Sequence, residues 1–198
     1  LNSQEKYKET LSIFENPNGA NGFELSEDNY LNYFTEWLKA LFNTGDYETY
    51  CSFLNQVLMF ESESPMVKLF ACNDLLKVLT LTEQNSSLVY KCLDFLKDMH
   101  KKYPHGKHTV QVINNIIFTS LELGEPIPQN LLNDFIPTIP LHPCNTATYG
   151  LYLIKIKHNA ERGLSYYDSA MVMAQKDSKF AGLTEELKVK KEIESAKY

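Results

Sequence analysis

The segment SSLVYKCLDFLKDMHKKY, residues 86–103, decides the fold class of this chain. Its apolar residues recur three and four positions apart, so they line one face of a helix: Leu88, Cys92, Phe95, Leu96 and Met99. The opposite face is charged and carries Lys91, Asp94, Lys97, Asp98, Lys101 and Lys102. Pro104 and Gly106 follow and end the pattern. We therefore predict an amphipathic helix over residues 86–103.

The same helical spacing continues along most of the chain in both directions. Ser64 and Pro65 are typical of an N-cap and a first helical residue, and Gly124 is typical of a helix end. No long stretch alternates between polar and apolar residues as a half-buried strand would. We predict an all-α protein with helices over 26–43, 46–60, from 64 onward, 86–103, 109–123, 129–136, 146–157 and 161–175, a charged amphipathic helix at the C-terminus and a leading helix over 3–15.

The predicted helices fall into pairs. The first helices of successive pairs begin near Ser26, Ser64, His108 and Asn145, at steps of 38, 44 and 37 residues, close to the length of one helix-turn-helix repeat. We predict a single domain over 1–198 in which antiparallel helical hairpins stack into a short right-handed α-α superhelix. A non-repetitive helical bundle is the alternative. Because the first residue is leucine, we expect the chain to be a segment of a longer or processed protein.

The charge of the chain is unevenly distributed. Its 198 residues sum to −6 at pH 7, with 7 Lys against 15 Asp and Glu in residues 1–99 and 12 Lys and Arg against 10 in residues 100–198. Arg162 is the single arginine of the chain. Because bidentate binding of phosphate depends on arginine side chains, this composition disfavours arginine-based recognition of phosphate. This balance argues against a DNA-binding protein or another generic polyanion binder.

The sequence holds no motif that indicates catalysis or a cofactor. It lacks a glycine-rich phosphate loop, an HExxH zinc motif, a GxSxG nucleophile elbow and a calcium-binding loop. No apolar run reaches the length of a membrane-spanning helix. We predict a non-catalytic protein with no cofactor, no metal and no membrane insertion.

Cysteine and histidine residues favour structural roles. The four cysteines form no CxxC pair, and we interpret them as reduced residues of an intracellular protein whose compartment is otherwise open: Cys51, Cys72, Cys92 and Cys144. The histidines of HKKYPHGKH, residues 100–108, have spacing unsuited to a metal site, and a weak anion or RNA contact is the alternative to a structural role. His142 lies beside Cys144, but no accompanying pattern indicates an activated nucleophile.

The predicted hairpin over 26–60 is rich in aromatic residues, among them Tyr30, Tyr33, Phe34, Trp37, Tyr47, Tyr50 and Phe53. Aromatic residues at this spacing most often pack in the core, but Trp and Tyr also dominate protein interfaces. The same two alternatives, packing in the core or binding a partner, apply to four tyrosines nearer the C-terminus: Tyr149, Tyr152, Tyr166 and Tyr167. We predict a scaffold or adaptor module that binds a protein partner in a larger assembly, using Tyr30, Tyr33, Glu36, Trp37, Glu48 and Tyr50.

Two segments resemble a known repeat motif. INNII at 113–117, followed by Gly124, looks like the start and glycine turn of a pentatricopeptide motif, and Thr148-Tyr149-Gly150 with the Asn159-Ala160 turn looks like another. In these segments and in its spacing the chain resembles the pentatricopeptide/tetratricopeptide superfamily of helical-hairpin repeats. The resemblance implies an alternative function, the binding of single-stranded RNA for RNA processing or translation in an organelle such as the mitochondrion. The residues for this alternative are Asn115, at the base-reading position, with Lys101, Lys102, Lys107, Lys155 and Lys157.

Overall fold

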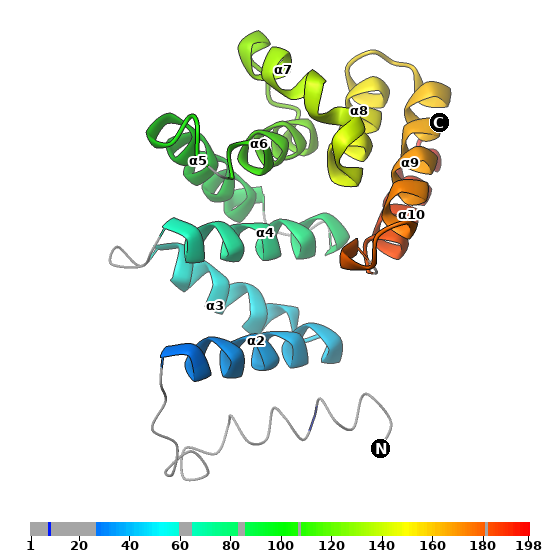
Figure 1. The fold of residues 1–198 in the computed structure, drawn as a ribbon. Helices are drawn as coiled ribbons and strands as arrows, with labels where there is room; N and C mark the ends of the chain where they lie inside the picture. The colour runs from blue at the N-terminus through cyan, green and yellow to red at the C-terminus, as the bar shows by residue number, and fades with distance from the viewer. Residues whose placement is uncertain (1–7, 9–26, 60–64, 83–85, 107, 181) are drawn as a thin grey trace. The chain divides into compact units, whose positions relative to one another are not determined.

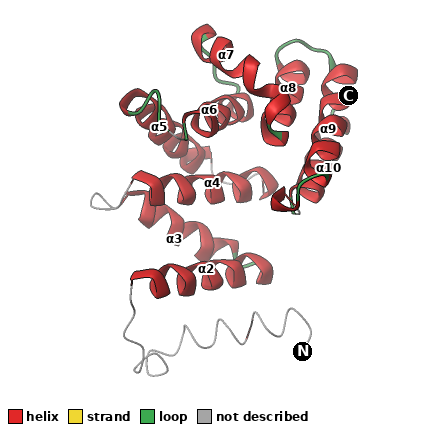
Figure 2. Cartoon of the chain, viewed as in Figure 1, coloured by secondary structure: helices red, strands yellow, loops and turns green. Residues whose placement is uncertain are grey.

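The computed structural model describes residues 8, 27–59, 65–82, 86–106, 108–180 and 182–198. This part of the chain is helical and contains no strand, which confirms the all-α prediction (Figure 2). The predicted leading helix over 3–15 lies outside the described residues, apart from Lys8. The chain divides into two compact units, unit 1 (residues 1–78) and unit 2 (residues 79–198).

Unit 1 contains a helical hairpin, α2 (Glu27–Thr44) and α3 (Tyr47–Met59), followed by most of α4 (Pro65–Thr82) (Figure 1). Gly45 turns the chain between α2 and α3 with φ of 80°, a conformation that costs glycine little because it has no Cβ. Asp46 then caps α3, since its Oδ1 accepts a hydrogen bond from the backbone N–H of Thr49 at 3.1 Å. Among the described side chains of the unit, all three helices contribute buried apolar residues: Ala40, Leu41, Tyr50, Leu54, Leu58, Leu69, Ala71, Cys72, Leu75 and Leu76.

Unit 2 begins with a second hairpin, α5 (Ser86–Lys102) and α6 (Thr109–Leu123). The predicted stripe of α5 is buried at Leu88, Cys92, Leu96 and Met99. α6 is the most apolar helix of the pair and buries Val112, Ile113, Ile116, Ile117 and Leu121. Gly124 ends α6 in the left-handed conformation, with φ of 71°, as the sequence predicts.

The chain then forms α7 (Gln129–Phe135) and a 3₁₀ helix, η1 (Ile136–Leu141). The C-terminal part consists of α8 (Pro143–Lys155), α9 (Ala160–Gln175), the short 3₁₀ helix η2 (Ser178–Phe180) and α10 (Leu183–Ser195). α9 contacts both α8 and α10, and α8 also contacts α6 (Figure 1). In this arrangement, side chains of α6, α8 and α10 contact one another.

The backbones of α8 and α9 approach each other closely at two glycines. A Cβ atom on Gly163 would lie 2.6 Å from the carbonyl oxygen of Gly150 and 2.4 Å from Cγ1 of Ile154. A Cβ atom on Gly150 would lie 2.7 Å from the carbonyl oxygen of Gly163. All three distances are shorter than van der Waals contact, so this crossing requires glycine on each helix.

The start of α8 differs from the prediction. We expect this helix to begin at Thr146, but it begins at Pro143 because His142 acts as the N-cap: its Nδ1 accepts a hydrogen bond from the backbone N–H of Cys144 at 3.2 Å. The preceding 3₁₀ helix is likewise held by side chains of α8, since Asn145 donates to Thr138 Oγ1 at 2.8 Å. Histidine is not among the usual capping residues, so the sequence pattern does not reveal this start.

Candidate functional site

Two aromatic residues of the predicted protein-binding surface, the half-buried Trp37 and the buried Tyr50, make ring contacts within the α2–α3 hairpin. Trp37 on α2 meets Phe53 on α3 edge to face, with ring centroids 5.1 Å apart. Phe42 meets Tyr47 and Tyr50 at centroid distances of 5.6 Å and 5.8 Å. Tyr50 is only 5% exposed, and burial raises the pKa of its hydroxyl. Tyr50 therefore belongs to the core of the hairpin.

The acidic members of the predicted surface are exposed. Glu36 on α2 pairs with Lys39 one turn later at 2.6 Å, and both side chains are more than half exposed. Glu48 lies exposed in the first turn of α3. Tyr30 and Tyr33 lie on α2, but their side chains are outside the described part of the structure. Glu36 and Glu48 are thus the described members of the predicted surface that solvent can reach most readily.

The two units differ strongly in charge. Unit 1 holds 5 Lys against 12 Asp and Glu, a net charge of −7, whereas unit 2 holds 14 Lys and Arg against 13 Asp and Glu, a net charge of +1. The excess negative charge of the chain therefore belongs to unit 1. Six of the twelve carboxylates and one of the five lysines of unit 1 lie outside the described residues, so its described part has a net charge of −2. An acidic unit attracts positively charged partners and increases their rate of association.

The residues for the RNA-binding alternative lie on three helical elements of unit 2. Lys101 and Lys102 are exposed at the end of α5, and Asn115 is half-buried on α6. Lys157 is exposed just beyond α8. Lys155, also on α8, is paired with a carboxylate of α6, and Lys107 lies outside the described residues.

Three half-buried tyrosines form a cluster on the α8–α9 hairpin. Tyr149 stacks on Tyr152 with ring centroids 5.9 Å apart and an interplanar angle of 20°. Tyr149 also meets Tyr166 of α9 edge to face at 5.0 Å. The ammonium of Lys157 lies 5.6 Å from the ring centroid of Tyr152, within the range of a cation–π interaction. Tyr167, in contrast, is 1% exposed and packs in the core.

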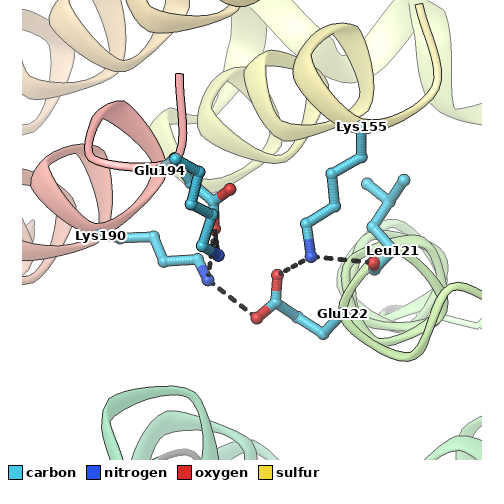
Figure 3. Close-up of polar contacts among 6 residues, drawn as sticks. Leu121, Glu122, Lys155, Lys190 and Glu194 are labelled. Carbon is cyan, nitrogen blue, oxygen red and sulfur yellow. Dashed lines mark hydrogen bonds and ion pairs between the residues drawn. The ribbon is translucent and has the colours of Figure 1, made fainter. Parts of the chain in front are cut away.

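A network of ion pairs connects three helices of unit 2. The carboxylate of Glu122 on α6 binds Lys155 of α8 at 2.9 Å through Oε1 and Lys190 of α10 at 2.8 Å through Oε2 (Figure 3). Lys155 also donates to the carbonyl oxygen of Leu121 at 3.0 Å. Lys190 also binds Glu194 on its own helix at 3.1 Å. We call Glu122, Lys155, Lys190 and Glu194 the ion-pair network.

Burial and the neighbouring lysines have opposite effects on the pKa of Glu122 in the ion-pair network. Glu194 is 1% exposed and is held between Lys190 and Lys197, both at 3.1 Å. Burial favours the neutral form of Glu122, but the ammonium groups of Lys190 and Lys155 outweigh it and hold the pKa of that carboxyl below its ordinary value. Removing one member of such a network leaves a charge without its partner in a poorly solvated place. The arrangement can therefore fix α10 to α6 and α8.

The Cys144 thiol lacks the properties of a nucleophile. Burial, assisted by the charge of Glu186, raises the pKa of this thiol to about 11, so it is protonated at neutral pH. The neighbouring His142 uses its Nδ1 to cap α8 and is not positioned as a base. Within the described ranges no cluster of three His, Cys, Asp or Glu residues could hold a metal ion. No described helix combines the length and apolarity needed to cross a membrane.

No protein-family model matches the sequence, and neither the curated proteins nor the solved structures give a significant match. The resemblance to pentatricopeptide and tetratricopeptide repeats therefore stays a prediction.

Sequence reasoning missed the ion-pair network and the tyrosine cluster. The two lysines that bind Glu122 are far from it in sequence: Lys155 lies 33 positions later and Lys190 lies 68 positions later. No local sequence pattern links groups at such distances. A weak signal exists for Glu122, a lone carboxylate near the end of the very apolar α6. The tyrosines are visible in the sequence, but their spacing does not distinguish the core residue Tyr167 from the surface cluster.

Proposed function

We propose that the chain is a non-catalytic helical scaffold or adaptor module that holds a protein partner on the acidic surface of unit 1. The observation that carries this proposal is the net charge of −7 in a unit of 78 residues, with Glu36 and Glu48 exposed on its hairpin. Charge complementarity indicates that the partner presents a basic surface. In this proposal the aromatic ring contacts of the α2–α3 hairpin give rigidity, and the carboxylates make the contact.

The proposal includes a repeat-like architecture in which the hairpins stack into a right-handed superhelix. Support comes from the succession of helix pairs α2–α3, α5–α6 and α8–α9 along the chain. Stacked helical pairs provide the extended surface that such modules use for binding. Small-angle X-ray scattering in solution tests this arrangement, since a globular bundle of 198 residues would have a radius of gyration of only about 16 Å. A measured value near that of a globular bundle would contradict a superhelix.

Reversal of the two exposed carboxylates tests the proposed surface. The double variant Glu36→Lys/Glu48→Lys should weaken capture of the partner in a quantitative pull-down at least tenfold, and added salt should weaken wild-type capture in the same direction. The matched control is Asp134→Lys/Glu192→Lys, which changes the net charge equally at exposed residues of unit 2. Capture that is unchanged by the first pair, or equally reduced by both pairs, would show that this surface is not the binding site.

A second function, binding of single-stranded RNA, is favoured by the tyrosine cluster. Tyr149 and Tyr152 stack in parallel beside Lys157, which combines an aromatic surface with a cation. Base stacking on such side chains contributes about 1–3 kcal/mol per base. Lys155 adds little to this surface because its ammonium is bound to Glu122.

The tyrosine cluster gives this second function its own test. If it holds, fluorescence anisotropy of a labelled oligonucleotide should show binding at low salt that is reduced about tenfold or more in Tyr152→Leu. The same binding should become weaker as salt rises, because lysines on phosphates release counterions. No binding at low salt, or binding unaffected by Tyr152→Leu, would reject RNA recognition at this cluster.

A further inference from the structure

Helix α10 buries little apolar surface. Of its 13 residues only Leu187 and Glu194 are buried, whereas α8, of the same length, buries nine. Leu187 and the half-buried Leu183 pack against an apolar strip on α8 and α9, formed by Ala147, Ile154, Tyr167 and Ala170. Val189 and Ile193 are half-buried, so Leu187 is the one fully buried apolar residue of α10.

Two ion pairs join α10 to the helices around it. Lys190 binds Glu122 of α6, and Lys191 binds Asp168 of α9. The side chain of Lys190 is 13% exposed and that of Glu122 is 20% exposed, so solvent screens this pair only weakly. Glu122 also binds Lys155, so one carboxylate connects α10 to both α6 and α8 (Figure 3).

The chain that leads into α10 has an anchor of its own. Phe180 of η2 meets the His142 ring edge to face, with centroids 4.9 Å apart, and Lys179 lies 4.8 Å from the centroid of the Phe180 ring. The N-cap residue of α10, Gly182, provides no side-chain hydrogen bond to the helix. The contact of η2 with His142 therefore does not depend on the ion pairs of α10.

We propose that α10 is a detachable strap, latched by the carboxylate of Glu122, that opens as one unit while the other helices of unit 2 stay folded. Opening uncovers the apolar strip formed by Ala147, Ile154, Tyr167 and Ala170. Local opening of this kind is expected of a helix with few buried apolar contacts whose attachment depends on a few charged groups. This inference is independent of the partner-binding surface on unit 1.

Hydrogen–deuterium exchange of the full chain, followed by mass spectrometry, tests the strap. In the wild-type chain the amides of α10 should exchange at least tenfold faster than those of α8 and α9, and the amides over 187–193 should share one degree of protection because they open together. Glu122→Gln should accelerate exchange in α10 a further tenfold or more and change exchange in α5 by less than threefold. The control Asp168→Asn, which removes the more exposed pair with Lys191, should accelerate α10 by less than threefold.

Three outcomes would overturn the proposal. The first is an amide exchange rate in α10 equal to the rates in α8 and α9, because unit 2 would then open only as a whole. The second is protection that falls steadily toward the C-terminus, which indicates simple fraying. The third is equal acceleration by Asp168→Asn and Glu122→Gln. If Glu122→Gln fails to fold, the same exchange measurement on Lys190→Met takes its place, because this variant keeps the aliphatic stem of the side chain. Its exchange rates, together with those of the wild type, then distinguish the strap from these three outcomes.

Discussion

Replacement of Gly163 by alanine should destabilise unit 2 strongly, although alanine is the better helix former. The substitution gains about 1 kcal/mol of helix propensity in the interior of α9. The new Cβ would lie 2.6 Å from the carbonyl oxygen of Gly150 and 2.4 Å from Cγ1 of Ile154, so α8 and α9 must separate by about 1 Å to restore contact distances. A backbone oxygen cannot rotate away, and Ile154 and Tyr167 are 0% and 1% exposed. Overpacking of this kind costs about 1–3 kcal/mol, and we take the upper end of that range.

The expected net loss is therefore about 2 kcal/mol in the free energy of unfolding, or roughly 6–8 °C in Tm for a unit of this size. Thermal and urea unfolding followed by circular dichroism at 222 nm measure it. The control is Gly182→Ala, where a Cβ meets no atom within 4 Å and the change should stay below about 0.5 kcal/mol. If Gly163→Ala is as stable as the wild type or more stable, α8 and α9 do not approach as closely as described.

Three further predictions concern unit 2. The pKa of Glu122 is lowered in the folded chain, so its contribution to stability is complete above the ordinary value of 4.5 and is lost as pH falls through the folded pKa. Urea titrations between pH 7 and pH 3 should therefore show a smaller acid-dependent loss of stability in Glu122→Gln than in the wild type. Equal losses would contradict the ion pairs of Glu122. Cys144, with a thiol pKa of about 11, should react with iodoacetamide at pH 7.5 at least tenfold more slowly than glutathione, and a comparable rate would show an activated thiol. Leu151→Ala should lower the free energy of unfolding by about 2–5 kcal/mol in urea titrations, because Leu151 is 0% exposed, and a loss below about 1 kcal/mol would contradict its place in the core.

The sequence predicts the helices well where the signals are local. The boundaries of α6 match the prediction, since Gly124 provides the left-handed end that the pattern requires. Asp46 caps α3 as expected. The start of α8 and the 3₁₀ helix before it could not be predicted, because they depend on His142 as a cap and on Asn145 binding Thr138 seven residues earlier.

Surface and core are harder to separate from sequence than helix and loop. Tyr50 and Glu48 are two positions apart on α3, yet the first is buried and the second exposed. Helical spacing groups the aromatic residues correctly on one hairpin, but which of them pack between α2 and α3 depends on how the two helices face each other. The same limit applies to Lys155, which the sequence presents as a surface cation and the fold turns toward Glu122.

Cross-linking of the partner complex with a zero-length carbodiimide tests the proposed acidic surface most directly, because this reagent joins a carboxylate only to an amine in direct contact with it. If the partner binds the acidic surface of unit 1, Glu36 and Glu48 should form amide links to lysines of the partner, and mass spectrometry should find those links more often than links to carboxylates of unit 2. Links confined to carboxylates such as Asp134 or Glu192, with none at Glu36 or Glu48, would show that the partner binds elsewhere.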